Sequence, residues 1–289
     1  MPYMQKTTCT SDKSILAIEK YYSWSVRPSG KQRAKRAQKQ NLSTERQQRI
    51  NYRNAVDKAA MLMANNFTEG DFYLTVTYDE DHRPAKEETL ERVNKDIRNF
   101  LDKLKRRYKK RGVEFKSVCI PENISGAGKG RPHFHVLIPQ LPGLEHRRKV
   151  FSELWGKGNV KVDEYGGTLT DARRLSGYFL KQDKKERGAR LRTSQNLKRP
   201  KEEKKTITRA NCYSFDFTIP EGYALNKEFS RQDYTEDGYP CQRLFFERVT
   251  GGTQDKRRYT FDADGFIKEA ARGRKRKTRG GVNPSLLRC

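Results

Sequence analysis

Two of the four histidines in this chain, His133 and His135, are separated by a single residue. The apolar residues around them predict a β-strand, in which alternate side chains point to the same face. Both imidazoles would then share one face and could bind one divalent ion, while Phe134 points into a core. Burying two imidazoles without a ligand or hydrogen-bond partners is costly. The pair is therefore a candidate metal site, with histidines that only pack or are exposed as the alternative.

A carboxylate would complete such a site, and Glu122 is the candidate. It is expected at the end of the neighbouring strand of a hairpin, where its side chain can reach the face that carries the histidines. Two neutral imidazoles, one carboxylate and open water positions suit Mg²⁺ or Mn²⁺. An ordinary loop carboxylate is the alternative for Glu122.

Tyr178 lies on a predicted helix and is the candidate nucleophile. On a helical wheel, the residues expected to pack are Ala172, Leu175, Ser176 and Phe179. A second face carries Arg174, Tyr178, Lys181 and Lys185. Such cations favour the phenolate and can hold a phosphate nearby. Because a free tyrosine has a pKa of about 10, a metal and cationic neighbours would both be needed for attack. A tyrosine ring packed at the helix edge is the alternative.

The composition indicates a polyanionic partner. The chain of 289 residues has 62 Lys and Arg against 36 Asp and Glu, a net charge of +26. This excess suits nucleic acid or an anionic membrane surface. No apolar run approaches the roughly 18 residues of a membrane span, and residues 1–10 show no signal-peptide pattern. The five cysteines are scattered, as expected in a reducing, intracellular setting. Nucleic acid is the favoured partner.

Hydrophobic periodicity predicts the elements that position these residues. Thr44 and Gln47 form a plausible capping box for a helix running toward Asn65. The elements that follow are a strand at 72–78, a helix at 90–108, a strand at 113–120, the histidine strand at 132–138, a short helix at 150–155, a strand at 159–162 and a helix at 168–184. The strands at 113–120 and 132–138 are predicted to form a hairpin.

The chain divides into four predicted regions. Residues 1–43 are expected to be a basic, flexible arm whose densest charge run is Lys31–Arg36, either solvated or in contact with DNA. Residues 44–202 carry the candidate site. Residues 203–270 alternate like strands and are predicted to form a small β-rich accessory region. Residues 271–289 are a second basic tail.

Three motifs, in this order, resemble rolling-circle replication initiators of the HUH endonuclease superfamily, in the plasmid and small-phage branch. Phe72–Tyr78 resembles the first motif of that family. Glu122 followed by Gly130–His135 resembles its metal motif, and Tyr178–Lys181 its Tyr-x-x-Lys motif. Ser194–Pro200 is similar to a further stretch, although Gln195 replaces the usual basic residue. Each motif is short, so the resemblance, which covers about residues 45–200, depends on their combination and order.

This resemblance implies an α+β fold, with an antiparallel sheet and helices packed on it in a ferredoxin- or RRM-like plan. His133, His135 and Glu122 would hold a divalent ion against the scissile phosphate. Tyr178 would attack to give a 5′-phosphotyrosine and a free 3′-hydroxyl, with Lys181 positioning the DNA or the metal. Resealing reverses the reaction, so no ATP is needed. Only one tyrosine is suitably placed, as in the single-tyrosine class, because Tyr165 lies in a Gly-rich turn.

The resemblance also implies partners and a location. The expected substrate is single-stranded origin DNA with a stem-loop, host replication proteins are possible partners, and the compartment is the cytoplasm of a bacterial host. Basic residues near the motifs are predicted to contact DNA, and these are Lys129, Arg131, Arg174 and Lys185.

Other functions fit the sequence less well. A relaxase or transposase of the same superfamily would use the same residues, but relaxases mostly place the tyrosine before the histidines. A non-enzymatic nucleic-acid-coating protein would account for the charge but not for the ordered motifs. Gly126–Gly130 resembles a phosphate loop only faintly, since Asn123 replaces the first glycine and no Ser or Thr follows Lys129. A metallohydrolase is disfavoured because Val136–Pro139, rather than further metal ligands, follows the pair.

Overall fold

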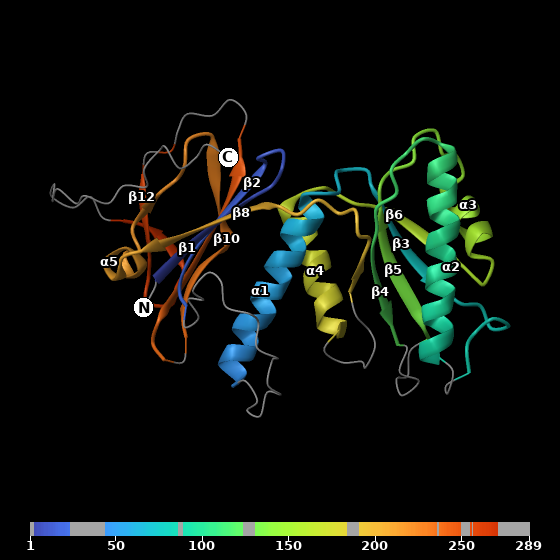
Figure 1. The fold of residues 1–289 in the computed structure, drawn as a ribbon, viewed down its shortest axis with the longest axis horizontal. Coiled ribbons are helices and arrows are strands. Elements are labelled where there is room, and N and C mark those ends of the chain that lie inside the picture. The colour runs from blue at the N-terminus through green and yellow to red at the C-terminus, as the bar shows by residue number, and fades with distance from the viewer. Residues whose placement is uncertain are drawn as a thin grey trace, which may run out of the picture. The chain divides into compact units, whose positions relative to one another are not determined.

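The computed structural model divides into two compact units, which are described separately (Figure 1). The central unit is Tyr52–Arg199. The flanking unit joins both ends of the chain, Met1–Asn51 and Pro200–Cys289. The structure describes residues 3–23, 44–85, 89–123, 131–183, 191–235, 237–249, 255 and 257–270.

A five-stranded antiparallel sheet forms the middle of the central unit, in the order β6-β3-β5-β4-β7. Its strands are β3 (Phe72–Thr77), β4 (Val118–Glu122), β5 (His133–Ile138), β6 (Val160–Glu164) and β7 (Arg192–Thr193). The predicted hairpin is present as β4 and β5, although β4 begins five residues later than expected. The predicted antiparallel α+β plan is confirmed.

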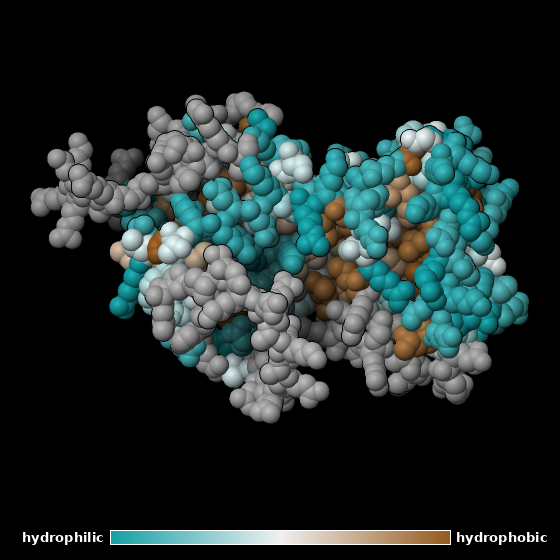
Figure 2. All heavy atoms as spheres, in the orientation of Figure 1, coloured by the Kyte–Doolittle hydropathy of each residue, from teal (hydrophilic) through white to brown (hydrophobic). Residues whose placement is uncertain are grey.

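Helices cover both faces of this sheet (Figure 1). One face is covered by α2 (Thr89–Lys110) and α3 (Arg147–Trp155), and the other by α4 (Leu169–Asp183) and α1 (Glu45–Ala64), which belongs to the central unit from Tyr52 onward. As the capping box predicted, the Thr44 side chain accepts a hydrogen bond from the Gln47 backbone at 3.4 Å. The outer side of α2 is covered largely by hydrophilic side chains, as the spacing of its apolar residues requires (Figure 2).

Alternation along the strands assigns the core to one face. Phe72, Leu74 and Val76 on β3, like Phe134 and Val136 on β5, are fully buried. They pack in one cluster with residues of α2 and α3, including Val93, Ile97, Phe100, Leu104, Phe151 and Trp155. The residues between them on β3 and β5 therefore point to the face covered by α1 and α4.

The flanking unit contains two antiparallel sheets and a short helix, α5 (Arg209–Tyr213). The larger sheet has the order β10-β11-β2-β1-β8 and the smaller has the order β13-β12-β9. Their strands are β1 (Tyr3–Cys9), β2 (Ile15–Tyr22), β8 (Lys201–Ile207), β9 (Phe217–Thr218), β10 (Tyr223–Tyr234), β11 (Pro240–Arg248), β12 (Arg258–Phe261) and β13 (Ile267–Glu269). The predicted β-rich character of the C-terminal region is confirmed.

The predicted flexible arm at residues 1–43 is wrong for its first half, because residues 3–22 form the hairpin β1–β2. Leu16 and Ile18 of β2 are buried and pack with Leu244 and Phe246 of β11. Burial of these apolar side chains outweighs the polar character that suggested an arm. The C-terminal strands are likewise not a separate appendage, since β8 pairs with β1 and β11 with β2. The charge run Lys31–Arg36 and residues 271–289 lie outside the described residues.

Candidate metal and tyrosine site

Strand register brings the three predicted ligands together. On β5, Phe134 is buried in the core, so His133 and His135 point to the opposite face. Glu122, the last residue of β4, pairs directly with His133. Directly paired residues share a face of a sheet, and the carboxylate therefore stands beside the imidazoles.

The ligand atoms form a compact group. His133 Nε2 lies 3.2 Å from one carboxylate oxygen of Glu122, and His135 Nε2 lies 3.4 Å from the other. One donor atom from each residue lies within 4.8 Å of the others. Glu122 and His135 are buried, with 4% and 6% of their surface exposed, while His133 is partly exposed. Among the described residues, these three form the only group of His, Cys, Asp or Glu with this spacing.

The backbone fixes which His133 nitrogen faces the site. His133 Nδ1 lies 2.9 Å from the carbonyl oxygen of Arg131, which can only accept a hydrogen bond. In neutral His133 the proton is therefore on Nδ1, and the lone pair of Nε2 faces the Glu122 carboxylate. Glu122 Oε1 is buried and accepts no hydrogen bond within the described part of the chain. A lone pair and a carboxylate facing each other need a cation between them, so this group can bind a metal ion.

His135 is held by two hydroxyl groups that sequence reasoning missed. Tyr73 Oη lies 2.9 Å and Thr75 Oγ1 lies 3.1 Å from its Nδ1. The rings of Tyr73 and His135 are parallel within 4°, with centroids 5.5 Å apart. Partners of this kind fix the orientation of a metal-binding imidazole and direct its other nitrogen to the ion. The only sequence signal was that Tyr73 and Thr75 alternate with the core residues of β3.

Helix α4 brings Tyr178 to the same group. Its hydroxyl donates a hydrogen bond to Glu122 Oε2 at 3.1 Å and lies 3.4 Å from His135 Nε2. Contact with α1 positions this part of the helix, because Tyr52 Oη donates to the Gly177 carbonyl at 2.9 Å. The Tyr178 side chain remains 40% exposed, so a large substrate can reach it.

The electrostatics of the site differ from the sequence-based expectation for Tyr178. Burial raises the pKa of the Glu122 carboxyl, but contacts with His133, His135 and Tyr178 outweigh this and lower it to about 2. Burial, together with the hydrogen bond to ionised Glu122 and its charge, raises the pKa of Tyr178 to about 12. The expected cationic surroundings would have lowered it. The closest charged group is instead a carboxylate, and Arg174 points into solvent.

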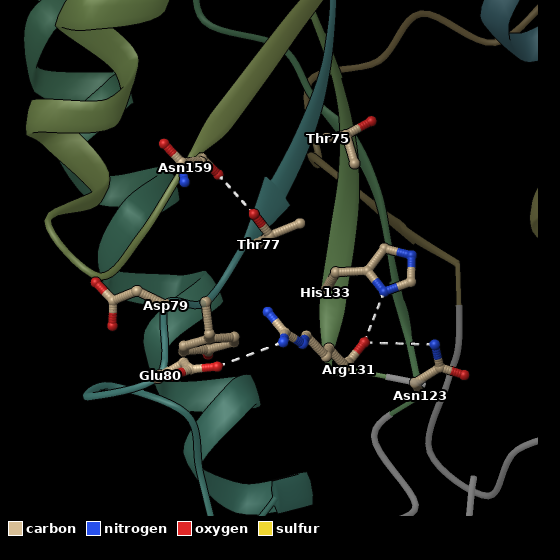
Figure 3. Close-up of a pocket in the computed structure, with 9 residues that line it drawn as sticks. Thr75, Thr77, Asp79, Glu80, Asn123, Arg131, His133 and Asn159 are labelled. Carbon is tan, nitrogen blue, oxygen red and sulfur yellow. Dashed lines mark hydrogen bonds and ion pairs between the residues drawn. The ribbon is translucent and has the colours of Figure 1, made fainter. Parts of the chain in front are cut away.

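A pocket of about 650 Å³ extends from His133 along the same end of the sheet (Figure 3). Its lining residues are Thr75, Thr77, Tyr78, Asp79, Glu80, Asn123, Arg131, His133 and Asn159. Arg131, a predicted DNA contact, is exposed here and lies 3.5 Å from Glu80. The pocket wall is thus mostly polar and adjoins the candidate metal ligands.

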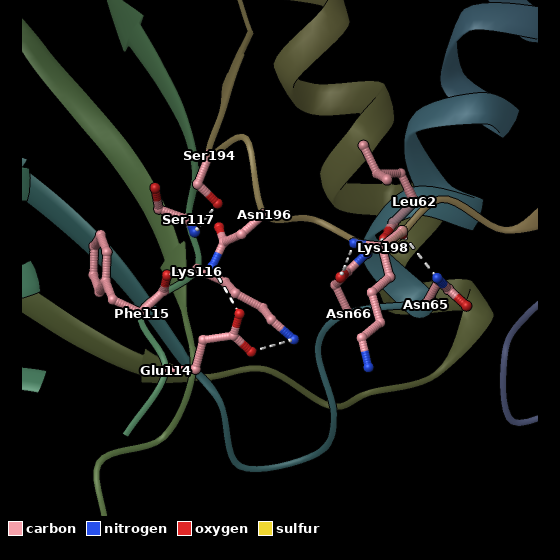
Figure 4. A network of polar contacts seen from close by, with 10 residues as sticks. All are labelled: Leu62, Asn65, Asn66, Glu114, Phe115, Lys116, Ser117, Ser194, Asn196 and Lys198. Carbon is pink, nitrogen blue, oxygen red and sulfur yellow. Dashed lines mark hydrogen bonds and ion pairs between the residues drawn. The ribbon is translucent and has the colours of Figure 1, made fainter. Parts of the chain in front are cut away.

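The segment Ser194–Pro200 has a structural role in the central unit (Figure 4). The Asn196 side chain donates a hydrogen bond to the Glu114 carboxylate at 3.0 Å. The Ser117 backbone, just before β4, donates to the Ser194 hydroxyl at 3.0 Å. This end of the segment therefore holds the chain that leads into the Glu122 strand.

The other end of the segment holds the two residues that directly follow α1, Asn65 and Asn66. The Lys198 backbone donates to Asn66 Oδ1 at 2.8 Å, and the side chains of Asn65 and Asn66 donate to the Lys198 carbonyl at 2.8 and 2.7 Å. The segment thus links β4 to α1, the helix on which α4 rests (Figure 4). These contacts are with the fold rather than with the three candidate ligands.

The remaining predicted site residues are placed as follows. Tyr165 is buried, 4% exposed, and within the described part of the chain its contacts are with residues other than the candidate ligands. Lys181 lies on α4, but its side chain, like all of Lys129 and Lys185, falls outside the described part of the structure. Among the described residues, no helix is long and apolar enough to cross a membrane.

Comparison with known proteins matches part of the chain to a protein family. Residues 71–186 match the family described as Replication-associated protein ORF2/G2P. This span, less than half of the chain, contains Glu122, both histidines and Tyr178. No curated protein and no solved structure matches the chain. The predicted resemblance is confirmed at the level of a replication-associated protein family.

Proposed function

We propose that this protein initiates rolling-circle replication by nicking single-stranded origin DNA with Tyr178. The observation that carries the proposal is the approach of the Tyr178 hydroxyl to Glu122, 3.1 Å away, within the group that also contains both imidazoles. A tyrosine that served only for packing would not need to reach a buried carboxylate. The family match over residues 71–186 supports the same conclusion.

Each residue has a distinct role in the proposed reaction. His133, His135 and Glu122 would hold Mg²⁺ or Mn²⁺, which as a Lewis acid stabilises charge on the scissile phosphate. Tyr178 Oη attacks phosphorus, and the bond to the 3′-oxygen breaks. The products are a 5′-phosphotyrosine and a 3′-hydroxyl that carries the proton the phenol loses. Lys181, one turn along α4, would help position the DNA.

The reaction exchanges one phosphodiester bond for another, so no nucleotide cofactor is required and the 3′-hydroxyl can reseal the strand. The raised pKa of Tyr178 indicates that the residues of the site alone do not activate the phenol. We therefore propose that activation depends on cations, namely the metal and the basic residues of α4. Arg131 and the adjoining pocket would receive nucleotides beside the scissile phosphate.

The proposed substrate is DNA of the replicon's origin, exposed as a single strand in a stem-loop, in the cytoplasm of a bacterial host. The net charge of +26 supports a polyanionic partner. Lys129, Arg174 and Lys185 are proposed as further DNA contacts, and host replication proteins as partners that extend the 3′-hydroxyl.

The nucleophile is tested by incubating the protein with single-stranded origin DNA and Mn²⁺ and looking for a covalent adduct on a denaturing gel. Tyr178→Phe should abolish the adduct, because the attacking oxygen is removed. Tyr165→Phe, which alters a buried tyrosine outside the site, should retain it. If Tyr178→Phe forms as much adduct as the unmodified chain, Tyr178 is not the nucleophile.

The metal site is tested by the double substitution His133→Ala, His135→Ala. Removal of two of three ligands should lower Mn²⁺ affinity, measured by calorimetry, by at least about 100-fold and abolish the adduct. An equal yield of adduct would contradict the metal site. A protein that only coats nucleic acid would give no adduct with either the unmodified or the substituted chain, and only salt-sensitive binding.

A further inference from the structure

Four tyrosine rings contact one another in series in the flanking unit, and we call them the tyrosine row: Tyr213, Tyr3, Tyr22 and Tyr239. Tyr213 and Tyr3 meet edge to face with centroids 6.1 Å apart, and Tyr3 and Tyr22 do so at 5.3 Å. Tyr22 and Tyr239 are stacked, with centroids 3.9 Å apart and planes within 6°. All four side chains are partly exposed.

Strand pairing places the row at one end of the larger sheet. Tyr3, the first residue of β1, pairs directly with Tyr22, the last residue of β2. Tyr239 stands immediately before β11, and Tyr213 ends α5. The hydrophobic core of the unit is built from other residues, among them Leu16, Ile18, Phe217, Leu244, Phe246 and Tyr259. The row is therefore an aromatic surface outside that core.

Cations surround the row. The Arg209 guanidinium lies 5.4 Å from the centroid of the Tyr213 ring. Gln5 of β1, two residues after Tyr3, pairs directly with Lys20 of β2 on one side and with Lys205 of β8 on the other. Since strand residues two apart share a face, both lysines lie on the face that carries Tyr3 and Tyr22.

The acidic residue of β2 points elsewhere, and Glu203 of β8, which pairs with Thr7 on the face of the row, lies further along the strand from Tyr3 than Lys205 does. Glu19 of β2 directly precedes Lys20 and therefore points to the opposite face. There it forms ion pairs with Lys6 at 2.9 Å and with Arg243 at 2.5 Å. The end of the sheet that carries the tyrosine row thus combines partly exposed rings with positive charge.

We propose that the tyrosine row binds single-stranded nucleic acid by stacking with unpaired bases, while Arg209, Lys20 and Lys205 attract the phosphates. Partly exposed aromatic rings flanked by cations are the combination that binds single strands without sequence preference, because every base has a π-face and every nucleotide a phosphate. Duplexes are poor ligands for such a surface, since their base faces are already stacked. This site is separate from the proposed nicking reaction and does not require Tyr178.

The test uses the full chain with a fluorescein-labelled 15-nucleotide oligothymidylate in EDTA, with binding followed by fluorescence anisotropy. Tyr213→Leu and Tyr239→Leu should each weaken binding about tenfold, because each removes one stacking surface. Tyr239→Phe keeps the ring and should bind like the unmodified chain. Arg209→Gln should instead reduce the dependence of affinity on salt concentration.

The matched control is Tyr223→Leu. Tyr223 is a partly buried tyrosine at the opposite end of the same sheet, where its hydroxyl donates a hydrogen bond to the Lys13 carbonyl at 2.9 Å. Tyr223→Leu should show any general loss of stability, which thermal unfolding measures, without the loss of oligonucleotide binding. If the row variants bind the oligonucleotide as tightly as Tyr223→Leu does, the proposal is wrong.

Two further measurements separate this proposal from the nicking reaction. A 15-base-pair duplex should bind more weakly than the single strand, and Tyr213→Leu and Tyr239→Leu should leave its affinity unchanged. If these substitutions lower the affinity for duplex and single strand equally, the row does not stack with unpaired bases. At saturating origin DNA, the row variants should still form the Tyr178 adduct. Tyr178→Phe should still bind the oligothymidylate with its row-dependent affinity, so either proposal can fail alone.

Discussion

The two faces of the central sheet are built from the same strands, yet they differ in every property that matters for function. On β5, Phe134 packs against Phe100 and Trp155 on one face, whereas His133 and His135 meet Glu122 on the other. The difference shows that a strand can supply stability and chemistry at once, because alternate side chains serve different surfaces.

Two buried carboxylates sharpen this comparison. Asp96 of α2 lies on the packed side, where it forms an ion pair with Lys157 at 2.6 Å and accepts a hydrogen bond from Tyr78 at 3.1 Å. Glu122 lies on the opposite face and is equally buried, but one of its oxygens accepts no hydrogen bond within the described residues. The first carboxylate is neutralised by a cationic side chain of the protein, while the second stands in a group that could hold a metal ion.

The largest expected effect comes from the packed face. Phe134→Ala removes a fully buried ring between α2 and α3 and should lower the free energy of unfolding by about 3–5 kcal/mol. Urea denaturation measures this change. Under conditions where the variant is folded, its Mn²⁺ affinity should match that of the unmodified chain. A loss of metal affinity in the folded variant would mean that the two faces are not independent.

Alternation of residue types explains how much could be predicted from the sequence. It placed Phe134 in the core and the histidines together. The helical period of Val93, Ile97 and Phe100 predicted α2, and the structure packs these residues with Phe134. The predicted hairpin brought Glu122 to the histidines, where it pairs directly with His133. The hairpin was thus accessible from local patterns, whereas the antiparallel sheet as a whole was implied by the family resemblance.

Long-range pairing explains what was missed. The β1–β2 hairpin gains its burial from β11, more than 200 residues later in the chain, and no local pattern indicates that partner. Tyr73 and Thr75 bond to His135 only through the register of β3 with β5, which the sequence does not specify. The unexpected rise in the pKa of Tyr178 has the same origin, since a helical wheel shows its neighbours on α4 but not Glu122 on β4.

An intermediate effect is expected from the hydroxyls behind His135. The double substitution Tyr73→Phe, Thr75→Val leaves the three metal ligands in place but removes both partners of Nδ1. It should weaken Mn²⁺ binding about 10- to 100-fold, measured by calorimetry. Both must be changed, because either hydroxyl alone can keep the Nδ1 contact.

Thr77→Val is the matched control for this pair. Thr77 lies on the same strand and the same face, but its hydroxyl donates to the Asn159 carbonyl at 3.2 Å rather than contacting an imidazole. Its Mn²⁺ affinity should stay within about twofold of the unmodified chain. If Thr77→Val and the double variant lose Mn²⁺ affinity equally, the loss comes from altered packing of this face and not from removal of the two hydroxyls that contact His135.

The smallest effect is expected where polar contacts serve only to join elements. Asn196→Ala removes the hydrogen bonds to the Glu114 carboxylate and the Phe115 carbonyl. It should lower the free energy of unfolding by about 1 kcal/mol or less, because Asn196 is exposed and water can replace the lost amide. The control is Gln195→Ala, which truncates the exposed neighbouring side chain and shows the effect of an alanine substitution in this segment that leaves Asn196 in place. Urea denaturation and the adduct assay should both be run. Unchanged adduct yield with Asn196→Ala would fit a linking role, whereas loss of adduct in a folded variant would show that the position of β4 relative to α1 controls the reaction at Tyr178.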